Sequence, residues 1–177
     1  MQKLIRATQG LIAALLIVCA IGLATFPGPA KAGPVTDYLE NKVIDWLFRA
    51  QSFTPPATLH VSLHTAACSD SSNGTEVSGG SYARVAVTSS LANWAGTQSA
   101  GSTTASSGTS GTTSNNGAIT FPSPTANWGV IMHFGVFDAS SSGNLLLCQA
   151  LTTSKTVNNG DAAPSFAAGA LTFQIDN

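Results

Sequence analysis

The spacing of apolar positions changes once along the chain, near Pro56. Before that point, the stretch TDYLENKVIDWLFRA (residues 36–50) carries Leu39, Val43, Trp46 and Leu47 at helical spacing. Either Thr36 or Asp37 can cap this segment, and Thr54-Pro55-Pro56 ends it. The pattern predicts one amphipathic helix, with Trp46 on the stripe that packs against a core.

Beyond Pro56 the period becomes two. In residues 58–65 (TLHVSLHT), one face carries Leu59, Val61 and Leu63, and the other carries His60, Ser62 and His64. This alternation predicts a half-buried strand with its polar face toward solvent. Strand-sized runs follow at 81–88, 117–121, 129–138, 144–151 and 169–176, and a hairpin-length loop at 139–143 separates the run at 129–138 from the run at 144–151. We therefore expect an all-β fold, an antiparallel β-sandwich of jelly-roll-like or barrel-like form, behind the single amphipathic helix.

Residues 1–32 have the pattern of a secretory signal. Lys3 and Arg6 precede an apolar run at 11–24, and Ala30-Lys31-Ala32 offers a cleavage site. Cleavage after Ala32 is the first prediction. The alternative is an uncut N-terminal apolar helix that anchors the chain in a membrane. A lipoprotein signal at Cys19 is disfavoured because the preceding Val18 is bulky.

The predicted organisation has three parts. Residues 1–32 are the signal or anchor, residues 33–56 the helix with a Pro-rich linker, and residues 57–177 the β-domain. The β-domain contains a low-complexity Ser/Thr/Gly stretch at 95–116, which we expect to be an exposed loop. The alternative is an extended strand edge that joins neighbouring subunits.

Charged residues make up only 8% of the chain, where about 25% is typical. From Gly33 onward there are four basic and eight acidic residues, and the basic ones are not clustered. Nucleic-acid binding needs clustered cations, so the composition argues against it. Membrane contact is expected only through residues 1–32, if they are retained.

Without residues 1–32 the chain keeps two cysteines, Cys68 and Cys148. An even pair in an exported domain predicts a disulfide. Two separate buried thiols are the alternative.

Candidate catalytic and metal-binding groups are sparse. His60 and His64 share a strand face but lie about 13 Å apart along the backbone. The serines lack a Gly-x-Ser-x-Gly turn, and the acidic residues are widely spaced. We therefore predict no catalytic residue, no metal and no cofactor.

Three aromatic residues are candidates for binding a glycan. Trp94 and Trp128 flank the low-complexity stretch, and Tyr82 lies in the second predicted strand. Exposed rings of this kind stack on sugars, whereas tryptophans beside turns also pack over the end of a sheet. Both interpretations are open from the sequence.

The succession YLENKVIDWLF, TPPATLHVSLHTAACSD and GTEVSGGSYARVAV resembles small bacteriophage tail-fibre proteins. The resemblance continues in order through ITFPSPTANWGVIMHFGVFDASSSGNLLLCQALTTSKTVNNGDAAPSFAAGALTF and covers about residues 36–177. It implies a β-rich, oligomeric structural component of a virion. Within its most specific block, Arg84 is expected either to pair with Glu76 or another carboxylate, or to stand exposed on its strand.

The sequence thus favours a non-enzymatic virion or surface attachment protein that forms homo-oligomers or joins other assembly proteins. A secreted carbohydrate-binding module that recognises a cell-surface glycan is the alternative. The expected location is the virion or the exterior of the cell, or the membrane if residues 1–32 anchor the chain.

Overall fold

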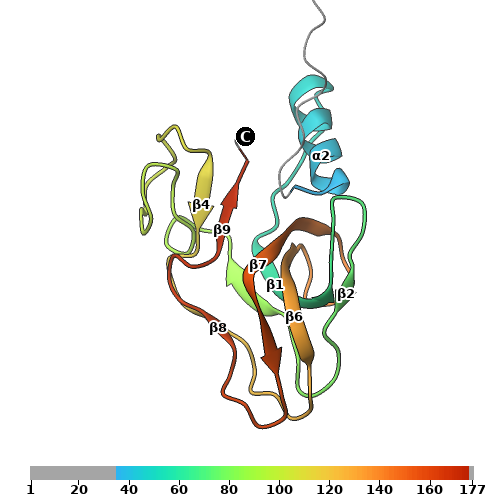
Figure 1. Cartoon of the computed structure of the whole chain (residues 1–177). Coiled ribbons are helices and arrows are strands. Elements are labelled where there is room, and N and C mark those ends of the chain that lie inside the picture. Colours follow the sequence, from blue (N-terminus) through green and yellow to red (C-terminus); the bar gives the residue numbers. More distant parts are fainter. Residues whose placement is uncertain (1–34, 176–177) are drawn as a thin grey trace, which may run out of the picture. The chain divides into compact units, whose positions relative to one another are not determined.

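A computed structural model describes residues 35–175 of the chain (Figure 1). It contains one α-helix, α2, and nine strands: α2 Asp37–Phe48, β1 Thr58–Ala66, β2 Thr75–Glu76, β3 Val85–Thr88, β4 Thr112–Ser114, β5 Ile119–Thr120, β6 Gly129–Phe137, β7 Leu145–Val157, β8 Ser165–Phe166 and β9 Thr172–Gln174. The prediction of antiparallel β-structure with one short helix is confirmed. The predicted signal or anchor at 1–32 lies outside the described residues. Among residues 35–175, no helix has the length and apolar character of a membrane span.

The main sheet has five strands in the order β2-β1-β6-β7, and β3 also pairs with β1. Every pairing in it is antiparallel. The predicted hairpin is present, because β6 and β7 flank the loop at 139–143 and pair along their length. Strand β7 continues to Val157, six residues beyond the predicted end at Leu151.

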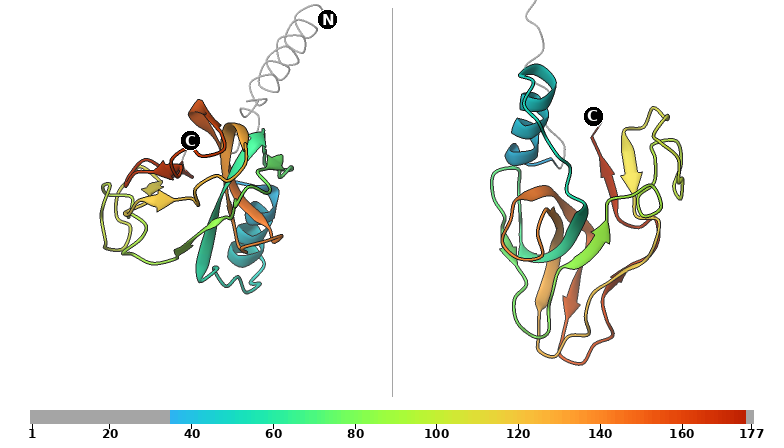
Figure 2. Two further views of the ribbon diagram at one scale, coloured as in Figure 1. Left: turned by 90° about the horizontal axis from the view of Figure 1, so that it is seen from below. Right: turned by 180° about the vertical axis from the view of Figure 1, so that it is seen from behind.

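Two further sheets have two strands each, β4 with β9 and β5 with β8. Side chains from both ribbons join those of the main sheet in one buried cluster, which includes Val61, Ile119, Phe134, Leu171 and Phe173. In the views of Figure 1 and Figure 2, the β4–β9 ribbon and α2 lie on opposite sides of the main sheet. The principal core therefore fills the space between the main sheet and the two ribbons.

Strand β1 departs from the prediction of a half-buried strand. Ser62 and His64, on the polar face, are both 0% exposed, as buried as Val61 on the apolar face. The reason is a second, smaller core on that face, formed by Cys68, Phe137, Leu145 and Cys148.

Helix α2 also departs from the prediction, because none of its residues is buried. Trp46, expected in a core, is 57% exposed, and Leu47 and Phe48 are 59% and 77% exposed. Thr36 occupies the N-cap position, but its side chain does not cap the helix. Its hydroxyl instead donates to the carbonyl oxygens of Leu145 and Leu146, at 2.5 and 3.1 Å. The helix is thus fixed to β7 at its start and exposes its apolar side chains beyond that point.

The low-complexity stretch at 95–116 contains both a loop and a strand. Strand β4 lies near its end, and Ala95 at its start is 6% exposed. Gln98 holds the loop between them, because its amide donates to Thr104 Oγ1 at 2.7 Å and its carbonyl accepts from Ser107 N at 3.2 Å. A loop closed by its own polar side chains needs no apolar anchor, which explains its composition.

Candidate functional site

Arg84 lies at the centre of a polar network that links several parts of the β-domain. Its Nε and Nη2 donate to the two carboxylate oxygens of Glu76 at 2.8 and 2.7 Å, which makes a bidentate ion pair. Its Nη1 donates to the carbonyl oxygens of Ala139 and Ser142, both at 2.8 Å. The guanidinium also lies 3.4 Å from the centre of the Phe137 ring. The Arg84 side chain is only 7% exposed, so these contacts leave it no free donor surface for a ligand.

Tyr82 extends this network. Its hydroxyl donates to Glu76 Oε1 at 2.9 Å and accepts from the backbone N–H of Leu63, also at 2.9 Å. Burial by itself raises the pKa of Glu76, but the hydrogen bonds from Arg84 and Tyr82 outweigh it and lower that pKa below its ordinary value. Burial also raises the pKa of Tyr82 far above its ordinary value. Glu76 is therefore held as a carboxylate and Tyr82 as a neutral phenol, a combination suited to holding strands together.

The three aromatic glycan candidates are separated by the fold. Trp128 is 5% exposed, donates from Nε1 to the Gly80 carbonyl at 2.9 Å, and meets Tyr82 edge-on with 5.4 Å between ring centres. Trp94 lies elsewhere, against Phe173, with 6.4 Å between ring centres. The structure therefore brings Tyr82 and Trp128 together as part of the core and places Trp94 apart from them. The three rings form no common open platform.

The second core contains a pair that the sequence pattern did not reveal. Ser62 Oγ and His64 Nε2 are hydrogen-bonded at 2.8 Å, and the His64 ring stacks on Phe137 with 6.2 Å between centres. Burial lowers the pKa of His64 below its ordinary value, an effect to which Arg84 adds and which Glu76 opposes. A serine beside a neutral histidine resembles a nucleophile and its base, but both residues are 0% exposed. The pair thus offers no surface to a substrate.

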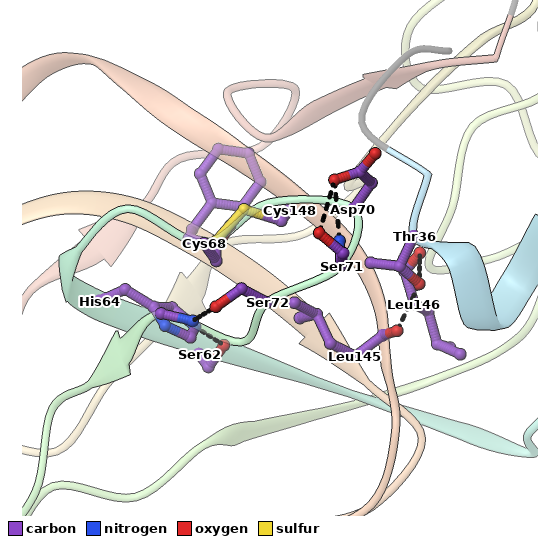
Figure 3. The surroundings of a disulfide bond; sticks show 12 residues. Thr36, Ser62, His64, Cys68, Asp70, Ser71, Ser72, Leu145, Leu146 and Cys148 are labelled. Atoms are coloured by element: carbon purple, nitrogen blue, oxygen red, sulfur yellow. Dashed lines mark hydrogen bonds between the residues drawn. A yellow bond between two sulfur atoms is a disulfide. The ribbon is translucent and has the colours of Figure 1, made fainter.

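The predicted disulfide is present beside this pair (Figure 3). Cys68 and Cys148 are bonded across 80 residues of sequence, with their Cα atoms 5.9 Å apart. The bridge joins the segment that directly follows β1 to the first part of β7. Within residues 35–175, no group of three or more His, Cys, Asp and Glu side chains is arranged to hold a metal ion.

A cleft borders the Arg84 network on the side of Leu63 and Phe121 but is lined by neither Arg84 nor Glu76. It has a volume of about 710 Å³ and lies between the end of β7 and the segment 161–166. Its floor is apolar, and Lys155 and Asp161 stand among its lining residues. Sequence reasoning missed this cleft because it depends on how far β7 and β8 separate.

Comparison with protein-family models matches residues 34–174 to the family described as Podophage GP4 fiber I protein gp80. Comparison with curated proteins found no match. Since the family match covers most of the chain, the protein belongs to this phage fibre family, as the resemblance over residues 36–177 implied.

Proposed function

We propose that the chain is an attachment subunit of a phage fibre, non-enzymatic, which assembles with copies of itself through helix α2. The observation that carries this proposal is the exposed apolar side of α2, formed by Val43, Ile44, Trp46, Leu47 and Phe48. Membership in a phage fibre family supports a structural role in a virion. Large apolar side chains gathered on one short helix mark an interaction surface.

The charges along α2 favour a second copy of the helix as the partner. Acidic residues Asp37 and Glu40 lie in its first turn, and Arg49 lies at its C-terminal end. In an antiparallel pair of helices, each acidic start faces the basic end of the other copy. The Arg49–Asp45 ion pair within one helix is exposed on the arginine side (69%), so its disruption costs little.

The β-domain supports the second part of the proposal, in which this domain faces outward and attaches to a target surface. Its five-stranded sheet and two ribbons enclose the principal core, and the Cys68–Cys148 bridge adds a covalent link. The absence of exposed surface on the Ser62–His64 pair supports a non-enzymatic role. The domain then serves as a rigid scaffold for recognition.

Light scattering coupled to size-exclusion chromatography tests the assembly step on the natural protein. We expect an oligomer for the parent chain and a monomer for the double variant Val43→Ser/Leu47→Ser. Leu91→Ser is the matched control, because Leu91 is 55% exposed and lies outside the helix. A monomeric parent, or equal oligomers for all three proteins, would overturn assembly through α2.

We also propose that residues 1–32 direct export and are removed. The disulfide supports this, because such bridges form in oxidising compartments. The N-terminal mass of the natural protein tests it directly, with a chain that starts at Gly33 as the expected result. A chain that retains residues 1–32 would favour the membrane-anchored alternative.

A further inference from the structure

The cleft between β7 and segment 161–166 has the dimensions of a ligand site. Its volume of about 710 Å³ falls within the usual range for small-molecule pockets. Its floor includes Leu63, Phe121 and Ile131, which are 4%, 2% and 2% exposed. These residues belong to the principal core, so the floor is rigid.

A break in strand pairing borders the cleft. Between the pairs Ile131–Lys155 and His133–Ala150, β6 advances two residues while β7 advances five. The extra residues of β7 form a bulge next to Lys155, with exposed hydroxyl side chains at Thr152, Thr153 and Ser154. Bulges of this kind redirect side chains at the edge of a sheet and are common beside binding sites.

Two charged residues of opposite sign line the cleft. Lys155 is exposed and forms no ion pair with any described residue, whereas Arg84 and Arg49 are each paired with a carboxylate. Asp161 accepts a hydrogen bond from the backbone N–H of Asn158 at 2.7 Å through Oδ2, which fixes the carboxylate and leaves Oδ1 available. The lining therefore offers the Lys155 ammonium as a donor and Asp161 Oδ1 as an acceptor, and the two charges cancel.

One aromatic ring stands at the cleft in a fixed position. Phe166 is half-buried, and its ring packs at 6.3 Å from Phe121 and 5.5 Å from Phe134, measured between ring centres. These contacts hold the ring while leaving part of it open to the cleft. An aromatic face of this kind packs against the C–H surface of a sugar ring.

We propose that this cleft binds a neutral saccharide. Neighbouring hydroxyls of a sugar both donate and accept, so Lys155 as donor and Asp161 as acceptor satisfy them together. Because the charges of Lys155 and Asp161 cancel, the cleft has no net attraction for an anionic or a cationic ligand, whereas a neutral polyol can use both groups through hydrogen bonds. The inference rests on the attachment role proposed above and gives it a ligand class, at a place distinct from Trp94, Trp128 and Tyr82.

A glycan array with the natural protein tests this proposal. The probes are neutral hexose, deoxyhexose and N-acetylhexosamine oligosaccharides, with uronic-acid and sialylated oligosaccharides for comparison. We expect binding to neutral probes, and a loss of about tenfold or more in affinity for Lys155→Gln, because a charged donor is removed. Lys42→Gln, which removes the same charge from helix α2, should bind as the parent does.

A second measurement uses the natural protein, so its result is independent of whether a variant folds. Mass spectrometry after mild acylation should show Lys155 protected by the bound neutral saccharide and Lys42 unprotected. Binding confined to anionic probes, no binding at all, or equal binding by Lys155→Gln and the parent would each overturn the cleft proposal. Such results leave the oligomer test of α2 unaffected, so the two proposals fail separately.

Discussion

Arg84 and Glu76 join two parts of the β-domain that lie on either side of a tight Gly79-Gly80 turn. Both hydrogen bonds of the ion pair are short, at 2.8 and 2.7 Å, and the carboxylate is 24% exposed. The same guanidinium reaches the carbonyls of Ala139 and Ser142 in the β6–β7 loop. One side chain thus ties β2, the approach to β3 and the principal hairpin together.

Replacing Arg84 with Ala should destabilise the protein by about 3–5 kcal/mol, because the Glu76 carboxylate and two carbonyls lose their donors in a largely buried place. Arg84→Lys should also destabilise it, since an amine cannot replace the bidentate pair and both carbonyl contacts. Urea unfolding measures both effects. The control is Arg49→Ala, which removes an exposed helical pair and should change stability by about 0.5 kcal/mol or less. Equal losses for Arg84→Ala and Arg49→Ala would contradict the role assigned to Arg84.

The disulfide should contribute substantially, because it closes a long loop. With a sequence separation of 80 between Cys68 and Cys148, the chain-entropy relation gives about 4–5 kcal/mol. The double variant Cys68→Ala/Cys148→Ala should therefore unfold at a much lower urea concentration than the parent under oxidising conditions. Under reducing conditions the parent should approach the variant. A parent unaffected by reductant while the bond is shown to be open would contradict this prediction.

Stability should fall as the solution is acidified below about pH 6.5, the ordinary pKa of histidine. Burial lowers the pKa of His64 in the folded protein, so the unfolded chain binds a proton there that the folded chain does not. A second loss is expected below about pH 4.5, since the pKa of Glu76 is also lower in the folded state than in the unfolded chain. Burial also lowers the pKa of His60, so His64→Gln should reduce the first phase without removing it and should leave the second intact. Urea unfolding over a pH range from about 2 to 8 separates the two phases, and an unchanged first phase in His64→Gln would refute the assignment.

The sequence predictions that agree with the structure depend on residue types and on patterns within short segments of the chain. The cysteine count after residues 1–32 predicts the Cys68–Cys148 bridge, and the two apolar runs on either side of loop 139–143 predict the β6–β7 hairpin. The pairing of Arg84 with Glu76 was one of two open interpretations, and the structure places these residues in contact. The carbonyl partners at Ala139 and Ser142 could not be predicted, because they depend on where a distant turn lies.

The predictions that failed share one physical cause, since periodicity shows which side chains share a face but not what covers that face. The apolar stripe on α2 predicts packing in a core, yet Trp46 is 57% exposed. The alternation in β1 predicts that Ser62 and His64 face solvent, yet both residues are 0% exposed. The hydrogen bond between Ser62 and His64 lowers the cost of burying these two polar side chains. Strand propensity cannot predict a hydrogen bond between two particular side chains.

Gly135 makes that buried pair possible, which yields the last prediction. A Cβ at this position would lie 2.7 Å from Leu145 Cδ1, 2.9 Å from Ser62 Oγ and 3.0 Å from His64 Nε2. Because all three neighbours are buried, Gly135→Ala should force them apart and destabilise the protein by about 1–3 kcal/mol. Gly117→Ala is the matched control, as a Cβ there meets no atom within 4 Å. Urea unfolding of the two variants should separate them clearly, and equal stability would show that the second core repacks around an added methyl group without loss.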